Sequence, residues 1–151
     1  ERFAGVQVKN FITSVIFENP YPSTRGNWDA GIAFRSAGLE DQYQVLITSG
    51  PKGSYWQFGS RQPNLRSTSW LAQGALPGTV KMGYPAENEL YLFVQREKGW
   101  LFVNNILIAS LDLNTRLNPG DVAVGNGFLS NTEIEGEFTR YKEFTVWELP
   151  R

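Results

Sequence analysis

The chain has 151 residues, of which 41% are hydrophobic, 14% aromatic and 19% charged, a composition that supports one core and excludes intrinsic disorder. It contains neither histidine nor cysteine, which excludes catalysis and zinc binding that depend on either side chain. Fourteen basic and fifteen acidic residues give a formal net charge of −1, which argues against nucleic-acid binding. The longest apolar runs, 90–94 and 106–109, are far shorter than the roughly 20 residues of a membrane span, so we expect no membrane insertion.

Alternation with a period of two predicts strands along the chain, and no segment shows a helical stripe. In chain order, we expect strands at residues 10–19, 28–35, 42–48, 56–58, 70–73, 90–95, 100–103, 106–111, 122–128 and 140–149. Turn-forming residues at 50–53 and 104–105 predict hairpins, and those at 118–121 predict another turn. About ten short strands with such connections predict one all-β domain over residues 1–151, an antiparallel sandwich or barrel.

Five segments, taken in order, resemble a known family. They are FENPYPSTRGNWDAGIAFR at 17–35, DQYQVLITS at 41–49, GWLFVNNILIASLDL at 99–113, GDVAVGNGF at 120–128 and RYKEFTVWEL at 140–149. The chain resembles the concanavalin A-like, laminin-G-like jelly rolls of bacterial proteins, in particular domains appended to receptor-type serine/threonine kinases and secreted proteins. The resemblance implies a two-sheet antiparallel jelly-roll sandwich whose concave face contacts a carbohydrate or a protein. It also implies an extracellular or cell-surface location within a larger multidomain protein. Because the chain begins at Glu1 and shows no signal peptide, we expect a processed or excised form.

Polar residues on two expected strands form the first candidate ligand-binding group. Asp29 and Arg35 are predicted to project from one side of their strand, and Gln42 and Gln44 share a face of the next strand. If the two strands are neighbours, these amides and charges form a shallow surface that can hydrogen-bond a sugar or a peptide. The alternative is an ordinary solvent-exposed face with an inert ion pair.

Aromatic residues near turns form the second candidate group. Tyr55, Trp70 and Trp100 lie beside turns or in weak strand segments, where we expect exposed rings. A tyrosine or tryptophan ring can stack on the apolar side of a sugar, and such residues are favoured at recognition surfaces. Trp28 and Trp147 lie on the apolar phase of their strands, so we expect them in the core.

Three alternating glutamates offer the one enzymatic alternative. If 133–137 were a strand, Glu133, Glu135 and Glu137 would line one face, as two carboxylates do in a retaining glycosidase. The pattern resembles the active-site strand of laminarinase-like glycoside hydrolases, although Glu135 stands where that family has aspartate. A charge run of this kind is more typical of a solvated loop, so we predict no catalytic residue.

A cluster of oxygen donors raises the question of calcium. Asp112, Asn114, Asn118 and Asp121 lie close together in the sequence, and calcium prefers six to eight hard oxygen ligands. Their spacing matches no defined calcium loop, and Asx residues form turns without a metal. We therefore predict no cofactor and no metal site, with calcium as the alternative.

Taken together, the sequence predicts a noncatalytic extracellular binding module that recognises a glycan or a surface protein through a concave sheet face. A structural or sensory protein-interaction domain is the second hypothesis, and a jelly-roll glycoside hydrolase is the third.

Overall fold

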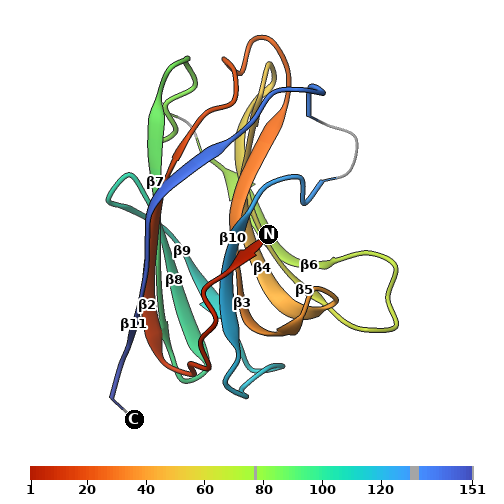
Figure 1. Cartoon of the computed structure of the whole chain (residues 1–151), viewed down its shortest axis with the longest axis vertical. Coiled ribbons are helices and arrows are strands. Elements are labelled where there is room, and N and C mark those ends of the chain that lie inside the picture. The colour runs from red at the N-terminus through yellow and green to blue at the C-terminus, as the bar shows by residue number, and fades with distance from the viewer. Residues whose placement is uncertain (77, 130–132, 151) are drawn as a thin grey trace.

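The computed structural model describes residues 1–76, 78–129 and 133–150, and their strands form two stacked antiparallel sheets (Figure 1). The six-stranded sheet has the order β1 (Arg2–Phe3), β10 (Asp121–Gly125), β3 (Trp28–Gly38), β4 (Asp41–Gly50), β5 (Gly53–Arg61) and β6 (Ser69–Ala75). The five-stranded sheet has the order β11 (Arg140–Glu148), β2 (Phe11–Glu18), β7 (Glu87–Gln95), β8 (Lys98–Val103) and β9 (Ile106–Asp112). The predicted all-β, two-sheet antiparallel sandwich is confirmed. Within the described ranges, no helix is long and apolar enough to cross a membrane.

Alternating side chains from both sheets build the core. On β2, every second residue from Phe11 is buried, because that phase of the strand faces the opposite sheet. Phe17 of β2 meets Trp28 of β3 edge to face, with 5.7 Å between the ring centroids. Each fully buried side chain of this size stabilises the fold by about 1.5–3 kcal/mol relative to an exposed one.

The ends of the predicted strands differ from the structure in two places. β1 was not predicted because its two residues, which pair with Val124 and Ala123 of β10, are too few to show a period. β10 ends at Gly125, whereas the alternation predicted a strand to residue 128. The chain leaves the sheet there through Gly127, whose φ of +70° favours glycine.

The edges of both sheets are poorly suited to pairing with further strands. β1 is very short, and each of the other three edge strands is interrupted by a register shift. Leu71 of β6 and Ile108 of β9 have no partner in the register, and on β11 the shift falls between Lys142 and Thr145. Bulges of this kind hinder the pairing of an edge strand with a strand of another chain. We therefore expect ligands to bind to the faces of the sheets.

Candidate functional site

The outer face of the six-stranded sheet is divided into a covered half and an open half. Over β10 and β3, the ring of Phe128 fills the space above two glycines: a Cβ at Gly31 would lie 3.1 Å from this ring, and one at Gly125 would lie 3.3 Å from it. Leu46, on the neighbouring β4, is buried although it belongs to the outward phase of its strand. Residues 126–129 therefore cover the part of this face around Gly31 and Gly125.

Asp29 lies under this cover. Its side chain is 0% exposed, and its carboxylate accepts hydrogen bonds from the backbone N–H groups of Phe128 at 3.1 Å and Leu129 at 3.0 Å. Burial raises the pKa of Asp29 to about 6, and the two backbone donors offset only part of that effect. Asp29 thus fixes the covering segment and is not available to a ligand.

The two glutamines of β4 are likewise buried and engaged. Gln42 donates to Glu1 Oε1 at 2.9 Å and accepts from the Ser36 hydroxyl at 3.0 Å. Gln44 accepts from the Thr68 hydroxyl at 2.8 Å. β3 and β4 are neighbours, but the polar residues on them are buried, so the expectation of an exposed polar surface is wrong.

Arg35 does not project beside Asp29, so that expectation is wrong as well. Its φ of 47° accompanies a register shift between β3 and β4, and the residue is only 1% exposed. It donates to the backbone carbonyls of Lys9 at 3.1 Å, Arg116 at 2.7 Å and Arg96. Burial lowers the pKa of this guanidinium. Arg35 therefore ties together the strand connections at one end of the sandwich.

The open half contains a hollow of about 380 Å³ over β4, β5 and β6, here called the β5–β6 hollow. Its lining residues carry hydroxyl, amide or small side chains: Thr48, Tyr55, Gln57, Gln73, Gly74 and Ala75. Gln57 and Gln73 lie directly opposite each other, and Tyr55 lies opposite both Thr48 and Ala75. The hollow therefore presents paired hydrogen-bonding groups, and none of its lining residues is charged.

Two exposed aromatic rings flank the glutamine pair. Tyr55 is 45% exposed, and its hydroxyl donates to the Lys52 carbonyl at 3.2 Å, which orients the ring. Trp70 is 37% exposed and lies against Gly59, where an added Cβ would come within 2.9 Å of the indole. Since Trp70 pairs with Gly59, the sheet places both rings on the same outer face. The predicted exposure of these two residues is confirmed.

The remaining predicted aromatic residues lie elsewhere. Trp100 is half-buried on β8 of the five-stranded sheet, where it stacks on Phe93 at 5.0 Å between centroids, so it does not join the β5–β6 hollow. Trp28 is fully buried, as predicted. Trp147 was expected in the core, but it is 51% exposed because its phase of β11 faces solvent.

The acidic segment after β10 has no strand geometry. Residues 133–137 form a turn; there Glu133 accepts a hydrogen bond from the Gly127 N–H at 3.0 Å, and Glu137 pairs with Arg25 at 2.5 Å. Glu135 is exposed. The three carboxylates therefore do not share a strand face, which removes the geometric basis of the glycosidase alternative.

The oxygen donors considered for calcium form separate local contacts. Asp112 accepts from the Asn114 N–H at 3.0 Å, as in an Asx turn. Asp121 accepts from the N–H groups of Gly5 and Val6, both at 3.0 Å, and so anchors the N-terminal segment. Across the described ranges, no three acidic, histidine or cysteine side chains gather into a group that could hold a metal ion.

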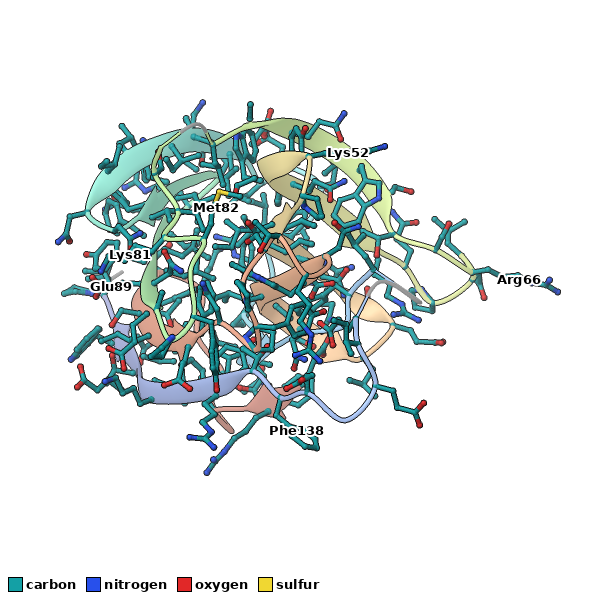
Figure 2. All side chains as sticks on the ribbon, turned by 90° about the horizontal axis from the view of Figure 1, so that it is seen from above. Lys52, Arg66, Lys81, Met82, Glu89 and Phe138 are labelled. Atoms are coloured by element: carbon teal, nitrogen blue, oxygen red, sulfur yellow. The ribbon has the colours of Figure 1, made fainter. Side chains whose placement is uncertain are left out.

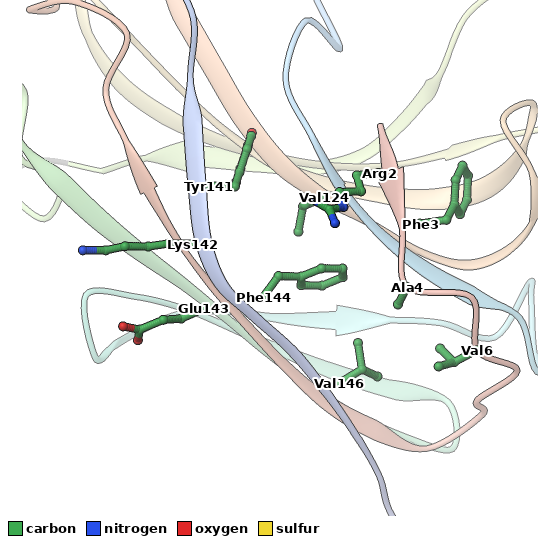
Figure 3. Close-up of a pocket in the computed structure, with 10 residues that line it drawn as sticks. All are labelled: Arg2, Phe3, Ala4, Val6, Val124, Tyr141, Lys142, Glu143, Phe144 and Val146. Atoms are coloured by element: carbon green, nitrogen blue, oxygen red, sulfur yellow. The ribbon is translucent and has the colours of Figure 1, made fainter.

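A second opening, of about 530 Å³, lies between the sheets beside β1, β10 and β11 (Figure 3). Phe144 and Val146 of β11 line it together with Val6 and Val124, and all four pack on the core. Arg2, Lys142 and Glu143 also line this opening, so it combines apolar and charged side chains. It offers no pair of amides comparable to that of the β5–β6 hollow.

Comparison with known proteins shows similarity of fold. No protein-family model and no curated protein sequence matches the chain. Carbohydrate-binding module CBM66 from Bacillus subtilis aligns over 95% of this chain and 78% of its own, with a TM-score of 0.68 and 11% identity. Sheep galectin-11, solved with glycerol, covers 96% of both chains with a TM-score of 0.64 and 14% identity. A family 16 endo-glucanase from Bacteroides ovatus aligns over 95% of this chain and 71% of its own, with a TM-score of 0.65 and 9% identity. The chain therefore has the galectin-like, concanavalin A-like jelly-roll fold.

Proposed function

We propose that this chain is a noncatalytic glycan-binding module and that the β5–β6 hollow is its binding site. The observation that carries the proposal is the placement of Tyr55 and Trp70 on one open sheet face, with the facing amides of Gln57 and Gln73 between them. Aromatic faces can stack on the apolar side of a sugar ring, while each amide can both donate to and accept from sugar hydroxyls.

The structural neighbours support this proposal at the level of fold. A carbohydrate-binding module and galectins share the sandwich, as does one glycoside hydrolase. The sequence resemblance to bacterial surface and secreted proteins adds to the proposal an extracellular location and membership of a larger multidomain protein. The turn that contains Glu133, Glu135 and Glu137 favours a binding role over a hydrolytic one.

A protein-contact role is the second candidate, and it is favoured by the outer face of the five-stranded sheet. Tyr91 and Phe102 form an edge-to-face pair at 5.4 Å, beside the stacked pair of Phe93 and Trp100. Aromatic residues are enriched at protein interfaces. This face lies on the opposite side of the sandwich from the β5–β6 hollow, so variants can test the two roles separately (Figure 1).

Glycan-array binding by the purified domain tests the first role. Trp70→Ala and Tyr55→Ala should each weaken binding of the retained glycan about tenfold or more, because each removes about 1.4 kcal/mol or more of contact energy. Trp147→Ala is the matched control, since it removes a ring of similar exposure from the other sheet and should leave glycan binding unchanged. The melting temperature of each variant reports whether it is folded. Binding that survives both hollow variants, or that is lost in Trp147→Ala, would contradict the proposed site.

A further inference from the structure

Outward-facing residues of β5 form a row that begins at Tyr55 in the β5–β6 hollow and continues past its lining residues to Gly59. Tyr55 and Gly59 are four residues apart on β5, and successive strand residues advance by about 3.3 Å, so their backbones are separated by about 13 Å. Trp70 pairs with Gly59 and lies against it, and its ring therefore marks the far end of this row. A single sugar ring is too short to contact both aromatic side chains.

Hydrogen-bonding groups occupy the middle of the row. Gln57 lies midway between Tyr55 and Gly59 on β5, and Gln73 faces it from β6. Each amide offers an oxygen acceptor and an NH₂ donor, and the two together suit a ligand whose groups also donate and accept. Hydroxyl groups have this property, whereas carboxylates and sulfates only accept.

Charged side chains near the hollow do not line it. Arg61 is the next outward-facing residue on β5 after Gly59, and it does not line the hollow. Its guanidinium Nη2 forms an ion pair with Glu40 Oε1 at 3.7 Å. Arg66 extends away from the molecule at the tip of the connection between β5 and β6, and Lys52 lies in the turn that precedes β5 (Figure 2). An anionic ligand would therefore find no cation in the lining to offset the loss of its hydration.

We infer that the β5–β6 hollow binds an uncharged glycan chain that lies along β5 and β6; this inference rests on the proposed function. Sugar units of this chain stack on Tyr55 and on Trp70, and the unit between them hydrogen-bonds Gln57 and Gln73. Contacts are spread along the chain, so affinity depends on chain length and not on a terminal sugar alone. The absence of charge in the lining makes that affinity insensitive to salt.

Titration calorimetry with two ligand panels tests this inference. The neutral panel contains galactan, mannan, xylan, fructan and β-glucan with their oligosaccharides of increasing length; the acidic panel contains heparin, polygalacturonate and alginate. We expect a neutral chain to bind, with an affinity that rises about tenfold or more from monosaccharide to tetrasaccharide. We also expect the affinity to stay constant between about 0.05 M and about 0.5 M salt.

Variants connect the length dependence to the two rings. Trp70→Ala and Tyr55→Ala should each reduce the affinity of the tetrasaccharide to that of a shorter chain, and the exposed Gln73→Ala provides a third test that leaves both rings in place. Trp147→Ala should retain the full length dependence. A monosaccharide that binds as tightly as the tetrasaccharide, a preference for the acidic panel, or a loss of affinity with salt would overturn this inference while leaving glycan binding intact. If neither panel binds, the proposed function fails together with the inference.

Discussion

Replacing Arg35 by methionine should lower the free energy of unfolding by about 3–5 kcal/mol, the largest single-residue effect that we expect, because it removes three hydrogen bonds from a charged donor. The guanidinium is buried and supplies hydrogen bonds to three backbone carbonyls from separate connections, those of Lys9, Arg96 and Arg116. Methionine fills much of the same volume but has no donor, so all three carbonyls lose the hydrogen bond from a charged group. Urea denaturation measures the change.

Arg66→Met is the matched control for this substitution. Arg66 is exposed in the connection between β5 and β6, so the same chemical change there should alter the free energy of unfolding by less than about 0.5 kcal/mol. A loss below about 1 kcal/mol for Arg35→Met would show that water or a rearranged backbone replaces the guanidinium. The proposed role of Arg35 at the end of the sandwich would then be wrong.

The buried carboxyl of Asp29 should make stability depend on pH. Its pKa of about 6 in the folded protein exceeds the ordinary value of 3.8, so the folded state holds this proton more tightly than the unfolded state does. The resulting stabilisation is fully present below about pH 3.8 and is lost as the pH rises through about 6. Between pH 7 and pH 4, the free energy of unfolding should therefore increase by about 2–3 kcal/mol more in the wild type than in Asp29→Asn.

Denaturation curves collected across this pH range measure the difference. Glu135→Gln removes an exposed carboxyl from the segment after β10 and should follow the wild type. Equal pH dependence in the wild type and in Asp29→Asn would mean that the Asp29 carboxylate is hydrated in solution. The account of residues 126–129 as a cover over this half of the sheet would then be wrong.

Most of the fold follows from local patterns in the sequence. The alternation at Trp28–Phe34 and the turn at 50–53 are decided by residues close together in the chain, so strands and hairpins could be predicted. The cover over β3 could not, because it depends on Phe128 and Leu129, which meet Asp29 across about a hundred residues. The burial of Gln42 and Gln44 likewise depends on contacts with residues distant in the chain, Glu1 and Thr68.

The candidate site was predicted only in part. Tyr55 and Trp70 lie near turns or in a weak strand segment, which was enough to predict exposed rings. Gln57 was missed, although its position between Trp56 and Phe58 already assigned it to the outward phase of the strand. Gln73 lies opposite Gln57 only because of the register between β5 and β6. The long connection at 62–68 contains no local pattern that predicts this register. Trp100 was also predicted to carry an exposed ring, but it is half-buried on β8, and its position beside a turn does not indicate to which sheet it belongs.

The most direct test of the central claim is an NMR titration of the isotope-labelled domain with the glycan that the array retains. We predict that the largest chemical-shift changes map to the amide side chains of Gln57 and Gln73, the Trp70 indole N–H, and the backbone around Thr48 and Tyr55. Resonances of Trp100 and Trp147 on the five-stranded sheet should not move. Shifts that centre on those two tryptophans, or on the opening beside Phe144, would place the ligand elsewhere and contradict the account.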